Sequence, residues 1–425
     1  MISAFFRKLR LVLTDSTLRA RILFILGAFV LFRFLAAIPV PGINRDALEA
    51  FFLNNQFFGL LNIFSGGGFS NLSLVMLGVG PYITASIIMQ LSTILFPKVK
   101  ALYSEEGEAG RAKFTAWGRY LTVPIAVTQG IAFLTLLQNS GIIAPLSSLE
   151  FATNVLLIAA GSMLLMWIGE LITEFGIGNG VSLIIFAGIA AGLPTGLAQA
   201  IFTATAADIP AYLGFAAIGI AVIYAVVSVS EAERSVPIAY ARQVRGVATS
   251  SAGASTYLPI RLLQAGVIPI IFALSLLLLP QMILAGIISL GFPAFQGAFD
   301  WYTAFSANPW AYGAAYFALV VMFTFFYTSI TFEPKRVADN LQKGGAFVPG
   351  VRPGPETERY IANVVARVTF PGALFLGAVA VIPFVVQGIT GISSLVIGGT
   401  ALLIAVQVVL DLIRKIDAQL SLREY

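Results

Sequence analysis

Residues 72–96 read LSLVMLGVGPYITASIIMQLSTILF, a run that contains no charged side chain. A helix needs about 20 apolar residues to cross the hydrocarbon core of a bilayer, because lipid offers no partner to an unpaired backbone polar group. The run is long enough to cross a membrane once. It contains Pro81, and proline is common in membrane helices. This stretch alone predicts a helical membrane protein.

The composition of the whole chain agrees with that prediction. Of its 425 residues, 58% are hydrophobic and 11% are charged, and the mean hydropathy is +0.91. Soluble domains are about 45–50% apolar and about 25% charged, so a water-soluble fold is not expected. We predict one membrane domain over residues 1–425. Cysteine and histidine are absent, which removes disulfides, thiol and imidazole chemistry and the common zinc sites. We therefore expect no metal and no cofactor.

Hydrophobic runs of sufficient length occur ten times, and the fold class is accordingly predicted as all-α and polytopic. The first run follows five basic residues but no small-residue cleavage site follows it, which favours an uncleaved first helix over a signal peptide. The predicted spans are 22–38, 72–96, 114–138, 151–169, 181–202, 212–230, 262–285, 310–332, 369–388 and 392–410.

Basic residues are confined almost entirely to one side of this arrangement. With ten spans, 23 of the 25 Lys and Arg fall before span one, after each even-numbered span, or at the end of the chain. The positive-inside rule then places both termini in the cytoplasm. Topology alone accounts for the net charge of +5, so we expect no direct DNA binding. The loops 231–261 and 333–367 are longer than topology requires, and such loops are typical of docking surfaces.

Five spans in each half give the halves opposite orientations, which is the arrangement of an inverted repeat. The first half covers about residues 1–205 and the second about 206–425. Pro81 and Pro269 occupy early positions in the second span of each half. This weak similarity between the halves is the internal evidence for the repeat.

The predicted spans contain very few charges. Arg33 lies near the outer end of span one, where its side chain can snorkel to the interface, and Glu170, Glu174 and Asp411 lie at cytoplasmic ends. Ion-coupled carriers usually keep ionisable groups at membrane depth, and intramembrane proteases need a catalytic dyad or triad. The chain offers neither pattern, which favours a conduit or scaffold and no enzymatic activity. A secondary transporter of a small solute and a non-conducting membrane scaffold remain as alternatives.

Two glycine-rich segments stand out. Residues 61–70, LNIFSGGGFS, are too short and too glycine-rich to span, and are either a displaceable apolar stopper or an outer surface loop. Residues 176–180, GIGNG, lack the strand and the Lys-Ser/Thr of a phosphate loop, so they predict a tight, flexible turn.

Two pairs of aliphatic residues, Val79 with Ile83 and Val181 with Ile185, are each four residues apart and so lie on one face of a helix. In so apolar a chain such pairs also fit simple packing.

Seven strings in order along the chain resemble the SecY family, the channel subunits of bacterial protein translocases. They are IPVPGI at 38–43, FSGG at 64–67, GPYITASIIMQL at 80–91, EGEAGR at 106–111, GIGNG at 176–180, AGVIP at 265–269 and GAFVPGVRPG at 345–354.

The resemblance implies ten spans in two inverted halves around a central hourglass pore, with a gate that opens sideways into lipid. It implies that residues 61–72 are the plug, represented by Leu61, Ile63, Phe64, Ser65, Gly66, Gly67, Gly68 and Phe69. The implied pore ring is Val79, Ile83, Val181, Ile185, Ile271 and Ile404. The implied lateral gate includes Ser86, Gln90, Gln129 and Pro269, whose polar members also fit ordinary hydrogen bonds between helices.

The resemblance also implies what the chain does and what it binds. The expected function is a channel in the bacterial plasma membrane that passes unfolded secretory polypeptides and releases transmembrane segments into lipid. Expected partners are SecE and SecG in the membrane, and the SecA motor ATPase or the ribosome on the cytoplasmic face. Arg242, Arg245 and Arg352 are the implied docking residues.

Overall fold

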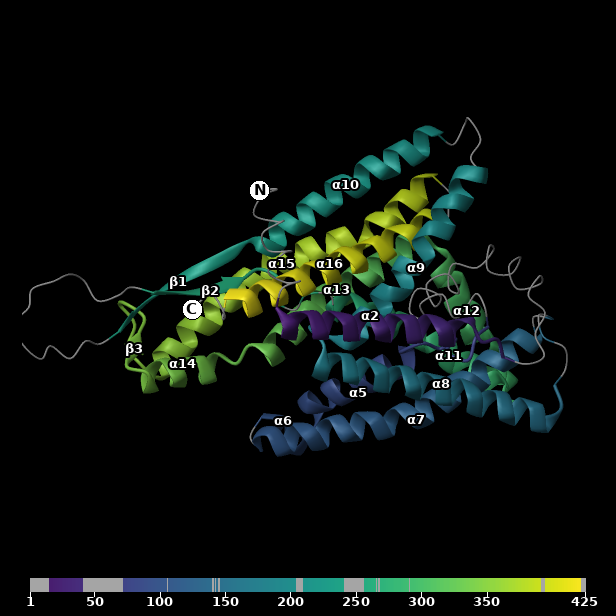
Figure 1. Cartoon of the computed structure of the whole chain (residues 1–425), viewed down its shortest axis with the longest axis horizontal. Coiled ribbons are helices and arrows are strands. Elements are labelled where there is room, and N and C mark those ends of the chain that lie inside the picture. The colour runs from purple at the N-terminus through teal and green to yellow at the C-terminus, as the bar shows by residue number, and fades with distance from the viewer. Residues whose placement is uncertain are drawn as a thin grey trace, which may run out of the picture. The chain divides into compact units, whose positions relative to one another are not determined.

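The computed structural model describes residues 15–40, 72–104, 106–139, 141, 143, 146–203, 209–240, 256–264, 266, 268–289, 291–390 and 394–421. Helices dominate this part of the chain (Figure 1). Each of the ten predicted spans overlaps one of them, and three further α-helices lie between spans. The helices are α2 (Ser16–Ala37), α5 (Gly80–Leu95), α6 (Pro97–Ser104), α7 (Gly107–Asn139), α8 (Ser148–Phe175), α9 (Gly180–Thr203), α10 (Ile209–Glu231), α11 (Ile268–Ser289), the 3-10 turn η1 (Pro293–Phe295), α12 (Gln296–Ala307), α13 (Pro309–Thr331), α14 (Pro334–Lys343), α15 (Pro355–Thr390) and α16 (Ser394–Ser421).

The prediction of a polytopic membrane protein is confirmed. Among the described residues, six helical stretches are long and apolar enough to cross a bilayer, and α5 with α6 forms a seventh if that pair, bent by 113°, is one broken span. The described apolar stretches of α9 and α10 are shorter, at Gly180–Gly192 and Ala216–Glu231. The count of ten spans therefore stays a prediction.

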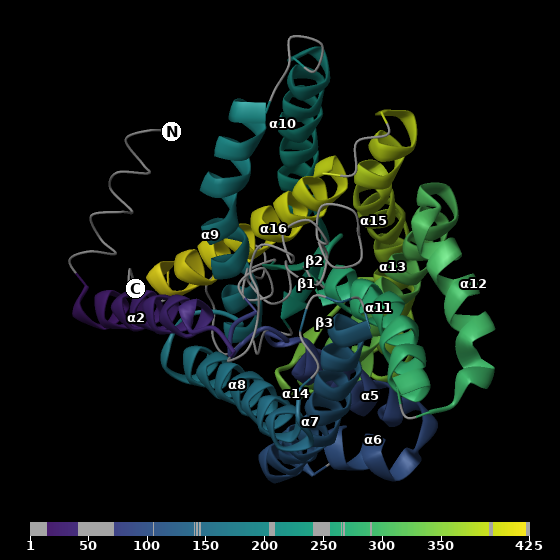
Figure 2. The ribbon, with the colours of Figure 1, turned by 90° about the vertical axis from the view of Figure 1, so that its right-hand side faces the viewer.

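The chain divides into two compact units. One comprises Met1–Leu213, Leu274–Tyr312 and Pro383–Tyr425, and the other comprises Gly214–Ala273 and Gly313–Ile382. In the first unit α5 packs on α7, α7 on α8, α8 on α9, and α9 on α16. Figure 2 shows α5, α6 and α7 grouped together in this unit. The two inverted halves remain a prediction.

The region before α5 differs from the sequence prediction. We expected a helix over 72–96, but residues 72–79 form turns and the helix begins at Gly80. The backbone N–H of Val40 donates to the carbonyl of Leu72 (2.9 Å), and that of Leu74 donates to Ile38 (2.9 Å). Leu72 and Gly78 have positive φ angles of 42° and 59°, which a continuous right-handed helix does not allow.

The turns before α5 are buried in a core formed with α7 and α8. Hydrophobic side chains from the three segments make one cluster, so the irregular backbone is covered by protein. Its fully buried members are Val40, Leu72, Met76, Leu77, Phe133, Leu134, Leu137, Ile143, Val155 and Ile158.

The second unit contains a small sheet in the order β2-β1-β3, formed by β1 (Glu233–Tyr240), β2 (Thr256–Arg261) and β3 (Ala346–Phe347). β1 and β2 pair antiparallel with Glu233 opposite Arg261, and β1 also pairs with β3. Segments 231–261 and 333–367, which we treated as loops, are thus partly structured. Alternate residues of β1, Val236 and Ile238, are buried, as expected when one face of a sheet packs on a core.

Candidate functional site

The start of α5 holds two of the predicted ring residues. Val79 is the residue that precedes the helix, and its carbonyl accepts the backbone N–H of Ile83 at 3.0 Å. Pro81 lies in the first turn, where the N–H it lacks would have no helical partner. Val79 is 0% exposed and Ile83 is 4% exposed. Both side chains are therefore directed into the protein and away from lipid.

The turn at 176–180 fixes the start of α9. The hydroxyl of Thr173 on α8 accepts the N–H of Gly180 at 2.9 Å, and the Asn179 side chain accepts the N–H of Ser182 at 3.1 Å as a helix cap. Gly178 has a φ of +102°, so glycine is required by this conformation. The predicted tight turn is present, and these hydrogen bonds hold it in place.

Helices α8 and α9 approach closely next to this turn. A Cβ placed on Gly180 would lie 1.8 Å from the carbonyl oxygen of Gly169, and one placed on Gly169 would lie 3.3 Å from Val181. At position 180 only glycine permits this approach, because a Cβ there would overlap the backbone of α8. The contact fixes the position of the first turn of α9, which carries Val181, relative to α8.

Two further ring residues lie on helices that pack together. Ile185 on α9 and Ile404 on α16 are each 0% exposed, and α9 packs against α16. Val181, one turn before Ile185, is half-buried. The first unit thus positions five of the predicted ring residues, directly before α5 or on α5, α9 and α16: Val79, Ile83, Val181, Ile185 and Ile404. Ile271 lies on α11 in the second unit and is also buried.

The predicted polar gate residues fall on packed helices. Ser86 and Gln90 lie on α5 and Gln129 on α7, and these two helices pack together. The amide oxygen of Gln90 is buried without a hydrogen-bond partner. A buried amide without a partner costs about 1–3 kcal/mol, so this position is not optimised for stability. Pro269, in the first turn of α11, is buried.

Arg352 is presented at the surface of the second unit. It is exposed, whereas Val348 is buried and Val351 packs in the core beneath the sheet. The Thr357 hydroxyl, on the first turn of α15, donates to the Arg352 carbonyl at 2.8 Å. Gly350 and Gly354 have positive φ angles on either side of Arg352. The backbone of this loop is therefore fixed, and the side chain of Arg352 is exposed on it.

Several predicted residues lie outside the described residues. These are the plug residues Leu61, Ile63, Phe64, Ser65, Gly66, Gly67, Gly68 and Phe69, and the docking residues Arg242 and Arg245.

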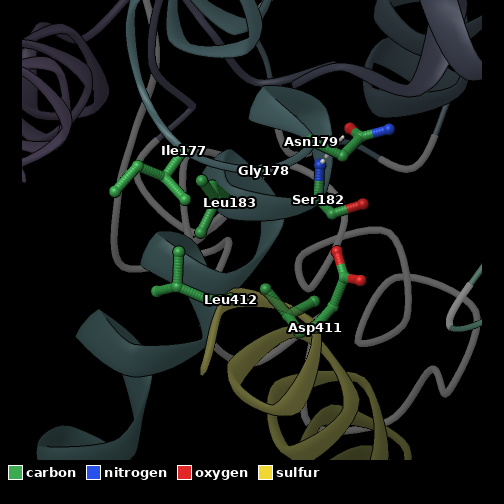
Figure 3. A pocket seen from close by; sticks show the side chains of 8 residues that line it. Ile177, Gly178, Asn179, Ser182, Leu183, Asp411 and Leu412 are labelled. Carbon is green, nitrogen blue, oxygen red and sulfur yellow. Dashed lines mark hydrogen bonds between the residues drawn. The ribbon is translucent and has the colours of Figure 1, made fainter. Parts of the chain in front are cut away.

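The sequence analysis missed a small hollow between the start of α9 and α16. Its empty volume is about 170 Å³, and Figure 3 shows Asp411 and Leu412 of α16 facing the turn at Asn179. The carboxylate of Asp411 pairs with Lys415 at 2.9 Å, one turn along the same helix. The GIGNG motif was the sequence signal for this place, but it gave no indication that α16 would cover it.

A second acidic group near the end of a span, Glu170, is also paired with a basic side chain. Glu170 on α8 accepts the Nε–H of Arg119 on α7 at 2.7 Å. In the described part of the chain, no group of three or more acidic, Cys or His side chains could hold a metal ion. What the site offers chemically is a set of buried aliphatic side chains, which exclude water and form no hydrogen bonds with side chains.

Comparison with known proteins identifies the family. The SecY family model matches residues 73–413. The protein translocase subunit SecY of Mycobacterium bovis is 40% identical over an alignment that covers 100% of this chain and 99% of the relative. The chain belongs to the SecY family. The SecY subunit of Streptomyces coelicolor is 38% identical, again over 100% of this chain and 99% of the relative. The family resemblance is therefore confirmed along the whole length.

Solved structures support the SecY fold. The structure of a protein conducting channel matches with a TM-score of 0.67 and 21% identity, over 95% of this chain and 93% of that one. A structure concerned with the plug domain of the SecY protein matches with a TM-score of 0.68 and 20% identity, over the same shares. At this level of identity these matches establish the fold, and the curated relatives establish the family.

Proposed function

We propose that this chain is the protein-conducting channel of a translocase, which passes unfolded polypeptides across a membrane and releases apolar segments sideways into lipid. The full-length identity to translocase subunits carries this proposal. The structural neighbours that are themselves protein-conducting channels support it. The chain would act as a passive conduit without catalysis, and a partner would supply the energy.

Val79, Ile83, Val181, Ile185, Ile271 and Ile404 are proposed to form the pore ring. A channel for arbitrary sequences cannot depend on fixed hydrogen bonds, and an aliphatic ring offers none to retain the substrate. When the pore is empty such a ring can dewet and resist ions. The burial of five of these side chains and the partial burial of Val181 support the assignment. The two inverted halves and the hourglass shape that the family resemblance implies are part of the same proposal.

The plug and the lateral gate complete the proposal. Residues 61–72 would add a second barrier to ions. Ser86, Gln90, Gln129 and Pro269 would line the gate, where contacts between polar groups of membrane helices are worth about 0.6–2 kcal/mol. Such contacts are weak enough to break when an apolar signal sequence competes for them. The amide oxygen of Gln90 has no hydrogen-bond partner in this structure, which fits a gate residue that forms its hydrogen bond when the gate is in a different conformation.

Partners and location follow from the family. Arg352, with Arg242 and Arg245, would dock SecA or the ribosome, since a guanidinium binds carboxylate and phosphate groups equally well. One of the solved structures that match this chain is Sec61 in a ribosome-channel complex, with a TM-score of 0.63. SecE and SecG would be the membrane partners. The chain would lie in the bacterial plasma membrane with both termini in the cytoplasm, as its basic clusters predict.

Crosslinking of a stalled substrate tests the channel directly. The chain has no cysteine, so each of Ile83→Cys, Ile185→Cys, Ile271→Cys and Ile404→Cys gives a single reactive site. A secretory polypeptide with one cysteine is stalled during translocation, and disulfide formation is measured. We expect crosslinks at all four positions.

Matched controls are available among exposed aliphatic residues on other spans. Val30 on α2 and Leu156 on α8 are 70% and 65% exposed, so Val30→Cys and Leu156→Cys should face lipid and remain uncrosslinked. Absence of crosslinks at all four ring positions would contradict the channel. A saturable small ligand, or no conductance after any change to residues 61–72, would favour the carrier or the scaffold instead.

A further inference from the structure

The connection between α11 and α13 carries four large aromatic side chains that remain largely exposed. Phe292, Phe295, Trp301 and Trp310 are 58%, 45%, 68% and 57% exposed. They lie directly before η1, on η1, on α12 and on the first turn of α13. Large aromatic residues that remain exposed together on one short element indicate a binding surface.

Helix α12 has three distinct faces. One is buried through Tyr302, and a second carries the polar residues Gln296 and Asp300, which are hydrogen-bonded to each other at 3.0 Å. The third contains Trp301 with the small exposed residues Gly297, Ala298 and Ala304. At 100° per residue the apolar and polar faces are separate sectors of the helix. A helix that lies between the protein core and water needs only a buried face and a polar face. The additional exposed apolar face indicates that α12 also contacts an environment other than water.

The buried face attaches α12 firmly to the first unit. The Tyr302 hydroxyl donates to the carbonyl of Leu277 on α11. Burial raises the pKa of Tyr302 to about 12, so the hydroxyl stays protonated at neutral pH. Phe305 packs against Tyr312 at 6.1 Å, and Tyr312 packs against Phe384 at 5.4 Å. The orientation of the exposed face is thus fixed by the fold.

The exposed face has the chemistry of a membrane–water interface. Trp301 stacks on Phe305 with ring centroids 5.9 Å apart, which gives a flat aromatic surface. Trp and Phe on one side and polar groups on the other are typical of helices that lie along the headgroup region. The flanking helices α11 and α13 are both candidate spans, so the connection between them must reach the membrane boundary. No Lys or Arg occurs between Arg261 and Lys335, which places the connection on the outer side.

We propose that η1 and α12 form a lipid-binding element that lies in the outer membrane–water interface and anchors the connection between α11 and α13 there. The aromatic face would insert among phospholipid headgroups and upper acyl chains, while Gln296 and Asp300 would face water. This element would hold the outer ends of α11 and α13 at a fixed depth. The inference depends on the chain crossing a membrane and not on what the channel carries.

Two single-cysteine variants test the proposal on the protein in vesicles of phosphatidylethanolamine and phosphatidylglycerol. Ala298 and Gln296 are both exposed and point about 160° apart on α12. Spin labels are placed at Ala298→Cys and at Gln296→Cys, and their accessibility to oxygen and to a water-soluble nickel chelate is measured. We expect the oxygen-to-nickel ratio to be at least about threefold higher at Ala298→Cys, because oxygen concentrates in lipid. Equal exposure of both labels to nickel would place α12 in water and overturn the proposal.

Fluorescence gives a second measurement that needs no label. The chain has four Trp, so Trp117→Phe, Trp167→Phe and Trp310→Phe leave Trp301 as the only one. We expect its emission to be quenched more by lipids brominated near the carbonyl end of the acyl chain than near the methyl end. The reference is Leu26→Trp, at the middle of α2, with the four native Trp replaced, and it should show the reverse order. If neither lipid quenches Trp301, this face lies away from lipid and the proposal is wrong.

Discussion

Replacement of Gly180 by alanine provides a direct test of the packing that positions α9. The added Cβ would lie 1.8 Å from the carbonyl oxygen of Gly169 and 2.8 Å from the Cβ of Ile172. The first of these atoms is backbone and cannot rotate away, so the two helices must separate. Overpacking of this kind costs about 1–3 kcal/mol, and we expect the upper half of that range. Better helix propensity returns at most about 1 kcal/mol, which leaves a net destabilisation of about 2 kcal/mol.

Two other glycines provide a graded set of controls. Gly192 lies on the same helix, and a Cβ there would have no neighbour within 4 Å, so Gly192→Ala should stabilise by up to about 1 kcal/mol through propensity alone. In Gly169→Ala the tight contacts would be with the Val181 and Ile184 side chains at 3.3 Å, which can move by a few tenths of an ångström, and the nearest backbone atom, the Val181 nitrogen, is at 3.5 Å. We expect Gly192→Ala to be the most stable of the three variants, Gly169→Ala to be intermediate and Gly180→Ala to be the least stable.

The assay must match the size of the effect. For a chain of 425 residues, an unfolding entropy of about 2.1 cal/mol/K per residue converts a difference of about 3 kcal/mol into about 3 °C. Thermal unfolding of the purified protein in detergent can resolve such a shift between Gly180→Ala and Gly192→Ala. Hydrogen exchange should also show faster opening at the start of α9 in Gly180→Ala. Equal unfolding temperatures for these two variants would refute the close approach of α8 and α9.

Three further predictions concern function and local stability. Arg352→Glu should abolish partner-driven transport into vesicles. The amount of the variant inserted in the membrane should be unchanged, because Arg352 is exposed and lies outside the core. Normal transport by this variant would exclude the docking role. Thr357→Val removes the hydrogen bond to the Arg352 carbonyl, which should lower the free energy of unfolding by about 1 kcal/mol and weaken binding of the cytoplasmic partner in a titration. The control Thr115→Val removes an exposed hydrogen bond within α7 and should leave that affinity unchanged. Gln90→Leu removes a buried oxygen without a partner and should raise the unfolding temperature; a lower value would show that this oxygen is satisfied in the native membrane.

The positions of the helices could be predicted from the sequence because an apolar run of span length has few alternatives in a chain so poor in charge. The start of α5 could not, since Leu72, Val75 and Met76 are as apolar in a turn as in a helix. The burial of Val79 and Ile185 could not be predicted either, because in a chain that is 58% hydrophobic a lipid-facing position and a core position use the same residues.

Some missed elements had a readable signal. In β1, Val236 and Ile238 alternate with exposed residues, which is the period of a strand with one buried face. The long loop prediction ignored this pattern. Helix α12 lacks the length of a span, so hydropathy passes over it, yet its aromatic and polar residues separate at helical spacing. The readable signal was the group of aromatic residues next to the end of a span, since Trp and Tyr are enriched at membrane–water interfaces.

The turns at 72–79 bear on what lies next to the start of α5. Non-helical backbone is tolerated at membrane depth only where protein covers it or where it lines a water-filled cavity, because lipid cannot bond to free N–H and C=O groups. Within this segment Met76 donates to Ser73 and Gly78 donates to Val75, at 2.9 and 2.8 Å, while the side chains pack on α7 and α8. The segment is therefore protected from lipid, and it ends at Val79. Coverage by α7 and α8 is therefore sufficient for turns to replace helix at this depth. The helix then begins directly after Val79, so that the first residue of the proposed ring is held between the buried turns and the rigid first turn of α5.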